Sequence, residues 1–431
     1  MARGDPTGPG QVSSTPERPP PRHAYDVVVL GAGLLGAVVA DRVRASAPGA
    51  SLLLAEAGGL PNEDGATVSS PGLLPPLRMD EPATAVDGAR PFAAAGAASP
   101  DRGALAWARA WSLEALGGAG KTRPAATGGA GWLVLEPVAH AGEGAAAGGA
   151  PGGGRAPDAA PLHALLPADV ALAACALTGV ARDHPAWLLD GGYLSAEALA
   201  LALARRAVEA GADLLLNARA RPQGRGRILL ERLGVDRRMR VGVHARQAVE
   251  ARTVVVACGA AGAVVSEEGL DRPVGLASAY LQFPRVRLPG PAPDAGLPVV
   301  ALGGWAWRPA PGGAMLVPPP LPPDPEGFEP VGGRLLGVPV GLRRELVDRL
   351  LDAPALAPLL ASGKLELGKS VRAVRGGRFS VPPDGRPVAE RLAQGWWLVA
   401  GGTLGLAHDV AAAAGVAAAV AGRPAPWQGG G

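Results

Sequence analysis

Three glycines near the N-terminus have the spacing that phosphate binding requires. Gly31, Gly33 and Gly36 follow a short apolar, β-branched run at 25–30, which is typical of a buried parallel strand. Apolar residues at helical spacing come next, so the turn opens a helix whose free N–H groups attract phosphate. The first glycine permits the tight turn, the second lets a pyrophosphate approach the backbone, and the third lets helix and strand pack closely. The pattern predicts a dinucleotide-binding βαβ unit.

A carboxylate stands where the ribose of a dinucleotide is expected. A second apolar strand is predicted at 51–55, and Glu56, 20 residues after Gly36, ends it. A carboxylate at this place can accept hydrogen bonds from ribose hydroxyls, and it would repel a 2′-phosphate. Glu56 therefore argues against NADP, but it does not distinguish NAD from FAD.

Further segments resemble the D-amino-acid oxidase and glycine oxidase family of FAD-dependent oxidoreductases. The stretch 65–74 (GATVSSPGLL) is similar to the family segment that passes the pyrophosphate and the flavin ring, where small residues let the backbone lie against a flat ring. Four other segments also resemble family motifs: 190–193 (DGGY), 253–259 (TVVVACG), 384–387 (DGRP) and 396–405 (WWLVAGGTLG). After 190–193, Ala196 stands where the family usually has proline. The resemblance spans 24–422 and is strong only in the FAD-domain segments.

The resemblance implies FAD as the cofactor. Gly401, Gly402 and Gly405 would allow close backbone approach, and the dipole of the helix that follows would favour the negative charge of a reduced flavin. The implied FAD-binding residues are Gly31, Gly33, Leu34, Leu35, Gly36, Glu56, Ala57, Gly65, Ala66, Thr67, Gly72, Leu73, Ala220, Ala257, Gly259, Gly401, Gly402, Thr403, Leu404 and Gly405.

The family's substrate anchor is missing from its usual position. Family members often hold the substrate carboxylate with an arginine five residues before the Asp of the P-D-G turn, and here that position is Phe379. Arg378 is one residue away, and in a strand a shift of one residue turns a side chain to the other face. A bulge could turn Arg378 inward, another arginine such as Arg372 or Arg375 could substitute, or the substrate is not a simple amino acid.

Tyr280 and His408 are the other candidates for the catalytic side. Tyr280 follows a family-like RPVG at 272–275, so it could line the pocket, and core packing is the alternative for it, as for Trp305 and Trp307. His408 falls in the first turns of the C-terminal helix, beside the predicted flavin. It is a candidate general base, although hydride transfer from an amine to flavin does not require one. A capping or packing role is the alternative.

The predicted fold class is α/β, with an FAD-binding Rossmann-like domain and a discontinuous α+β substrate domain built on an antiparallel sheet. Strands of the nucleotide-binding type come from three separate stretches, which suggests that a second domain is inserted twice. Other expected elements are helices at 105–116, 195–210, 342–351 and about 406–421, and hairpin strands at 228–230 and 240–244. The expected divisions are a disordered tail at 1–22, an FAD-binding domain at 23–80, 185–275 and 370–425, a substrate domain at 81–184 and 276–369, and a surface insertion at 142–160.

Composition limits the partners. A net charge of +3 over 431 residues gives no argument for nucleic acid or a membrane surface. No secretory signal and no apolar stretch long enough to span a membrane is found, and the two isolated cysteines, Cys175 and Cys258, fit a reducing cytoplasm. No metal site is expected. The expected partners are a small-molecule amine or amino acid and oxygen or another electron acceptor.

The predicted function is FAD-dependent oxidation of a primary or N-methyl amine or amino acid to an imine by hydride transfer. Two alternatives remain open. One is an FAD-binding subunit or degenerate homologue without amine oxidase activity, which Phe379 motivates. The other is an NAD-dependent Rossmann enzyme, which the first glycine turn and Glu56 support but which has no use for the segments at 65–74 and 401–405.

Overall fold

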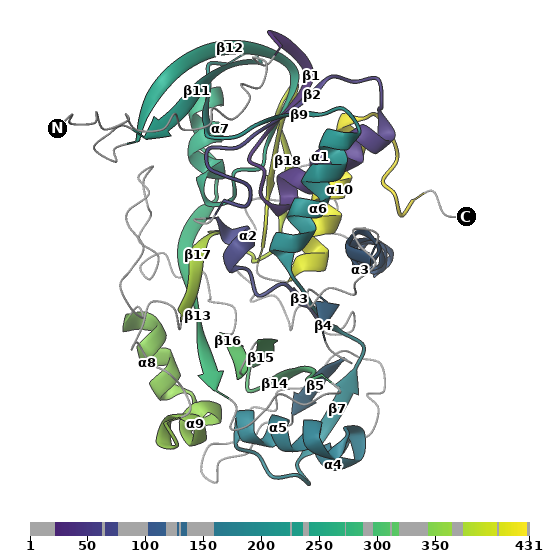
Figure 1. Cartoon of the computed structure of the whole chain (residues 1–431), viewed down its shortest axis with the longest axis vertical. Coiled ribbons are helices and arrows are strands. Elements are labelled where there is room, and N and C mark those ends of the chain that lie inside the picture. Colours follow the sequence, from purple (N-terminus) through teal and green to yellow (C-terminus); the bar gives the residue numbers. More distant parts are fainter. Residues whose placement is uncertain are drawn as a thin grey trace, which may run out of the picture.

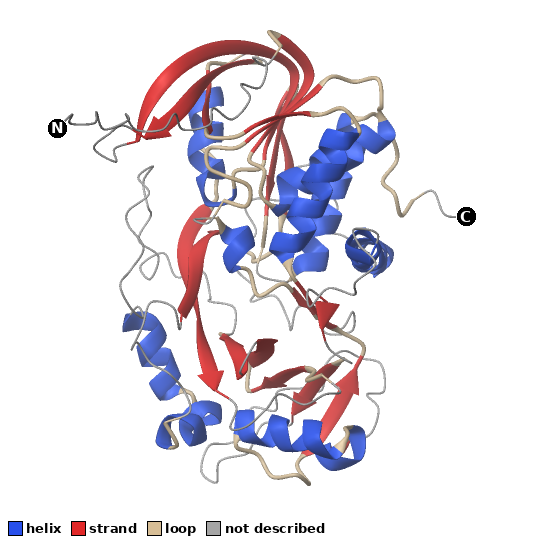
Figure 2. Cartoon of the chain, viewed as in Figure 1, coloured by secondary structure: helices blue, strands red, loops and turns tan. Residues whose placement is uncertain are grey.

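The computed structural model places two large sheets and a small one among helices (Figure 2). The first large sheet and its helices fill the upper half of the view in Figure 1, and the second fills the lower half. The described residues are 22–62, 65–75, 102–117, 127–128, 131–135, 159–224, 226–235, 241–271, 273–287, 296–310, 313–318, 344–363, 374–402 and 405–428.

The first sheet combines a parallel core with an antiparallel ribbon. Its strands are β1 (Ala24–Leu30), β2 (Leu52–Ala55), β9 (Asp213–Leu215), β10 (Ala218–Pro222), β11 (Arg227–Val235), β12 (Val241–Val256), β18 (Val388–Ala393) and β19 (Trp396–Ala400). The parallel neighbours run in the order β9, β2, β1, β12 and β19. β12 also pairs antiparallel with β11, so one strand of 16 residues belongs to both the ribbon and the parallel core.

Helices cover both faces of this sheet. One face packs against α1 (Leu34–Ser46), α3 (Arg102–Gly117), α6 (Ala196–Glu209) and α10 (Leu406–Val420). The other face packs against α7 (Gly262–Leu270), which the short helix η1 (Gly259–Ala261) precedes. Because β1 and β2 are buried on both faces, they read as continuous apolar runs rather than as alternating ones.

Five of the described helices cover one face of the second sheet. Its strands, in spatial order, are β17 (Val374–Val381), β13 (Ala277–Arg287), β16 (Gly313–Val317), β15 (Trp305–Ala310), β14 (Val299–Leu302), β5 (Trp132–Leu135), β7 (Pro185–Leu189) and β6 (Ala160–Pro161). The helices are α4 (Leu162–Leu165), α5 (Ala168–Thr178), α8 (Arg344–Asp352), η2 (Pro354–Leu356) and α9 (Ala357–Ala361). Trp305 and Trp307 point into this helix-covered core, as expected for packing side chains.

A short segment links the two halves. It comprises α2 (Ala66–Ser69) and β3 (Leu73–Leu74), and β3 joins β8 (Gly192–Leu194) and β4 (Thr127–Gly128) in the small sheet. Leu73 and Tyr193 pack against Trp132, Val299 and Ala306 on the face of the second sheet that the helices leave uncovered. The segment at 65–75 therefore lies between the two large sheets (Figure 1).

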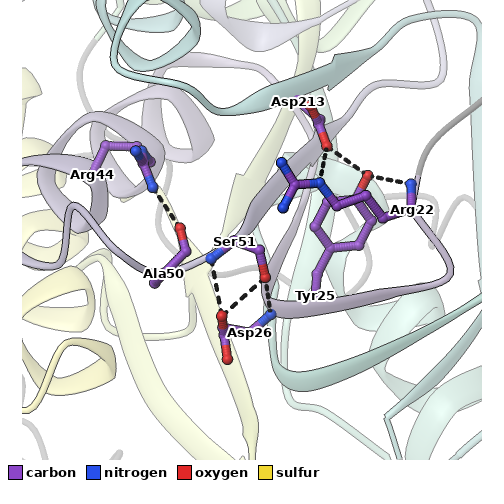
Figure 3. A network of polar contacts seen from close by, with 7 residues as sticks. All are labelled: Arg22, Tyr25, Asp26, Arg44, Ala50, Ser51 and Asp213. Atoms are coloured by element: carbon purple, nitrogen blue, oxygen red, sulfur yellow. Dashed lines mark hydrogen bonds and ion pairs between the residues drawn. The ribbon is translucent and has the colours of Figure 1, made fainter. Parts of the chain in front are cut away.

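Polar contacts fix the register where β1 begins (Figure 3). Ser51 N–H and Oγ both donate to Asp26 Oδ2 at 2.9 Å, and Asp26 N–H donates back to Ser51 Oγ at 2.9 Å. The Tyr25 hydroxyl donates to Asp213 Oδ2 at 2.8 Å, and burial together with Asp213 raises the pKa of Tyr25 to about 12. Because a one-residue slip would break all of these bonds, they hold β1, β2 and β9 in one alignment.

The elements agree with the sequence analysis except at their ends and in the ribbon. The expected helices at 105–116, 195–210, 342–351 and 406–421 are α3, α6, α8 and α10, displaced by a few residues. The hairpin expected from 228–230 and 240–244 is confirmed as the antiparallel pair of β11 and β12, but β12 runs on to Val256 instead of ending near 244. The predicted tail at 1–22, apart from Arg22, and nearly all of the insertion at 142–160 lie outside the described residues. The domain division remains a prediction, although α3, which it assigns to the substrate domain, packs in the core of the first sheet.

Candidate active site

The three glycines of the first turn meet different surroundings. A Cβ on Gly31 would lie 2.5 Å from the Ala257 carbonyl oxygen, and one on Gly36 would overlap the carbonyl oxygen of Gly31. Gly31 also has φ +98°, a backbone conformation that L side chains rarely adopt. Among the described residues, a Cβ on Gly33 would meet only Thr67 Oγ1, at 3.0 Å. Chain packing therefore requires glycine at 31 and 36, whereas the space beside Gly33 is open to a ligand.

The N-terminus of α1 faces this open space. Gly33 is its N-cap residue and supplies no side-chain cap, and Leu34 N–H donates to Thr67 Oγ1 at 2.9 Å. Leu35 and Gly36 follow in the first turn, whose N–H groups have no partner within the helix. Thr67 thus fixes the segment that begins at Gly65 against the positive end of the helix.

Glu56 lies against the same turn. Its Oε2 accepts from Ala32 N–H at 2.7 Å, and its Oε1 accepts from Gly58 N–H at 3.0 Å and from Asn62 Nδ2 at 2.9 Å. The side chain is buried, whereas Ala57 is exposed. A carboxylate has about four acceptor sites, so these three bonds leave capacity for a ribose hydroxyl.

Small residues at the end of β12 adjoin the nucleotide turn. Ala257 is buried directly beneath Gly31. Cys258 Sγ donates to Leu30 O at 3.3 Å, and burial is the main reason why the pKa of this thiol rises to about 12, so it stays protonated and packs. Gly259 has φ +53° and opens η1. Ala220 packs against the core on the α7 side of the sheet.

The segment at 65–75 runs past the edges of both large sheets. Gly65 forms an isolated bridge with Arg378 of β17, and Ala66 and Thr67 begin α2. Gly72 has φ +61°, and a Cβ there would overlap the carbonyl oxygen of Leu194. Leu73 pairs with Tyr193.

The C-terminal glycine turn lies beside this segment. A Cβ on Gly402 would lie 2.7 Å from Pro387 N, and one on Gly405 would lie 2.8 Å from Pro75 Cδ and 3.3 Å from Leu73 O. Gly401 O accepts from Ser380 Oγ at 3.0 Å, which ties the turn to β17. Thr403 and Leu404 lie outside the described residues. The structure thus brings the N-terminus of α10 close to the 65–75 segment.

Two titratable groups follow this turn. His408 is 4% exposed, its Nδ1 is buried without a hydrogen-bond partner in the described part of the chain, and burial and Arg386 lower its pKa to about 4. A neutral, enclosed imidazole fits the packing role better than that of a general base. Sequence analysis missed Asp409, whose Oδ1 accepts from Gly402 N–H at 2.8 Å and whose pKa burial raises to about 7. A lone acidic residue in an alanine-rich helix was the available signal.

The anchor position is occupied by an aromatic side chain. β13 and β17 pair without interruption from Ala277 opposite Val381 to Pro284 opposite Val374, so the bulge that would turn Arg378 inward is absent. Arg378 and Phe379 point to opposite faces. The Phe379 ring packs edge to face on Phe283, with ring centroids 5.8 Å apart.

Each face of β17 meets a different predicted flavin segment. Arg378 lies opposite Tyr280 and shares its face with Ser380, the partner of Gly401. A Cβ on Gly377, on the face of Phe379, would lie 2.8 Å from Ser69 of α2. Of the other arginines considered, Arg372 lies outside the described residues, as does the side chain of Arg375.

Comparison with known proteins identifies the fold. No family model and no curated protein matches the chain. Solved structures match nearly all of it, including iminodiacetate oxidase from Chelativorans sp. BNC1, at 21% identity with a TM-score of 0.58 over 93% of this chain and 96% of that chain. Glycine oxidase from Geobacillus kaustophilus matches at 16% identity with a TM-score of 0.59, over 94% and 96% of the two chains. The chain has the fold of glycine oxidase. L-proline dehydrogenase from P. horikoshii shares this glycine oxidase fold at 14% identity with a TM-score of 0.57, over 94% and 96%.

The glycine oxidase fold confirms the predicted fold class and the fold that the sequence resemblance implied. Within the described ranges, no helix is long and apolar enough to cross a membrane. The described residues also contain no group of three or more His, Cys, Asp or Glu side chains that could hold a metal ion.

Proposed function

We propose that the chain binds FAD and oxidises an amine or amino acid. The observation that carries this proposal is the open space at Gly33, which adjoins the N-terminus of α1, Thr67 and Glu56. A Gly-rich turn that served packing alone would have neighbours against Gly33, as it has against Gly31 and Gly36. The residues present therefore fit the pyrophosphate and ribose of a dinucleotide.

FAD is favoured over NAD because two further segments converge on the same region. The backbone at 65–75 lies between the sheets, and Gly405, at the start of α10, adjoins Leu73. When bound, FAD would supply the hydride acceptor for the oxidation of a C–N bond to an imine. Small residues would let this chain lie against the flat ring, and the N-terminus of α10 would favour negative charge nearby.

The neighbours in structure favour an amine or amino acid as substrate. These neighbours are an iminodiacetate oxidase, a glycine oxidase and an L-proline dehydrogenase. For this chain we propose the same class of reaction, with oxygen or another acceptor reoxidising the cofactor. Phe379 favours a second candidate, an FAD-binding protein without amine oxidase activity, because it replaces the usual anchor.

An absorption spectrum of the purified protein tests the proposal. We expect a yellow protein that releases FAD on denaturation and whose visible absorbance bleaches when an amino acid is added without oxygen. A protein that binds NAD but cannot be reconstituted with FAD would refute the cofactor assignment. A yellow protein that no member of a panel of amines and amino acids bleaches would favour the second candidate.

A further inference from the structure

Two arginines lie on the same face of the second sheet as Phe379. Arg285 of β13 is opposite Met315 of β16, and Met315 is opposite Arg308 of β15, so the three form one cross-strand row. Arg285 is two residues from Phe283, whose ring contacts Phe379, so these side chains share a face. The helices pack on the opposite face, which carries Val286 and Trp307.

The segment at 65–75 spans this face. At one end, Ser69 lies against Gly377, which shares the face of Phe379. At the other end, Tyr193 pairs with Leu73 and its ring lies under the guanidinium of Arg308, whose central carbon is 4.6 Å from the ring centroid. A substrate between this segment and the sheet would therefore meet the arginine row.

The arginine row lies beside an apolar core. The neighbouring core on this face is apolar and includes Trp132, Val299 and Ala306. Burial raises the pKa of Tyr193, although the charge of Arg308 opposes this rise. Arg285 has no carboxylate partner among the described residues, and its Nε is buried there without a hydrogen-bond partner. A cation in such surroundings gains most from an anionic ligand.

We propose that Arg285 and Arg308 bind the carboxylate of the substrate in place of the arginine that Phe379 replaces. This inference rests on the proposed function and names its substrate class, an amine that carries a carboxylate. Tyr193 contacts the flat face of the Arg308 guanidinium, and a carboxylate would meet the N–H groups at the edge of that plane. Phe379 and Phe283 supply an apolar wall beside the anchor.

Ligand binding to the FAD-loaded protein tests the proposal. Sodium propionate is the anionic probe and propionamide is its neutral counterpart of the same shape, with binding followed by the flavin spectrum and by calorimetry. We expect propionate to bind at least about tenfold more tightly than propionamide. Arg285→Ala and Arg308→Ala should each weaken propionate about 10- to 100-fold and leave propionamide unchanged, and Arg308→Lys should recover part of the loss.

Arg287→Ala is the matched control, because Arg287 is an exposed arginine two residues farther along β13. It should bind propionate like the wild type. Equal propionate affinity in the wild type, Arg285→Ala and Arg308→Ala would overturn the proposal. So would a loss confined to Arg378→Ala, or an FAD-loaded protein that does not bind propionate by either method. A wild-type protein that binds no FAD would instead contradict the proposed function.

Discussion

Replacement of single glycines by alanine separates ligand binding from packing in the first turn. Gly36→Ala places a methyl group on the carbonyl oxygen of Gly31, and because that neighbour is backbone it cannot move aside cheaply. Gly33→Ala meets only the side-chain oxygen of Thr67, at 3.0 Å, so a shift of a few tenths of an ångström relieves the contact. The first change should impair folding and the second should impair cofactor binding.

The expected magnitudes differ between the two variants. Overpacking at Gly36 should cost about 1–3 kcal/mol of unfolding free energy, which lowers the Tm of the apoprotein by several degrees. Gly33→Ala should cost less than about 1 kcal/mol of that free energy. It should nevertheless weaken FAD binding by more than about tenfold, because the methyl group fills the space that the pyrophosphate would enter.

Thermal unfolding of the apoproteins and titration with FAD, followed by flavin fluorescence, measure the two effects. Gly49→Ala is the control, since a Cβ there would meet nothing within 4 Å. If Gly33→Ala bound FAD as tightly as the wild type, the pyrophosphate would not lie at this turn. If Gly36→Ala unfolded at the wild-type temperature, the packing role of that glycine would be wrong.

Three further substitutions probe the buried polar groups. Glu56→Ala should weaken FAD binding by about 1–3 kcal/mol through the lost charged hydrogen bond, and unchanged affinity in an FAD titration would refute the ribose role. The pKa of Asp409 rises from 3.8 to about 7 on folding, so its contribution to stability falls as pH increases between those values. The Tm of Asp409→Asn should therefore change less with pH across this range than the Tm of the wild type. The pKa of His408 falls from 6.5 to about 4 on folding, so stability should rise with pH over that interval. If the Tm of His408→Gln rose with pH as steeply as that of the wild type, another group would be the one that titrates.

Local pattern was sufficient to predict the parallel core and its glycine turns. The strands before Gly31 and Glu56 are buried on both faces, so burial left a continuous apolar run in the sequence. The continuity of β12 could not be read in this way. Its residues from 241 to 248 are nearly all exposed in the ribbon, so no buried apolar run connects them with the buried end of the same strand at 254–256.

The arginine row could not be predicted because it depends on pairing between strands that are distant in sequence. Arg285, Arg308 and Met315 come from three strands, and only the observed register aligns them. The family pattern instead points to the position of Phe379, where a shift of one residue decides which face a side chain takes. The alternation of Trp305 and Trp307 indicated a strand, but not that Arg308 faces away from their core.

The polar contacts at the start of β1 bear on how this protein could be fixed to a surface. Arg22 is tied to the start of β1 through the bond from its N–H to the Tyr25 hydroxyl, and β1, about 23 Å long, separates this end from the glycine turn. A tag joined ahead of Arg22 would therefore pull on the end of the sheet that is remote from Gly31. On a bead, such a tether would hold the remote end of β1 and would leave the nucleotide turn at the other end of the strand away from the point of attachment.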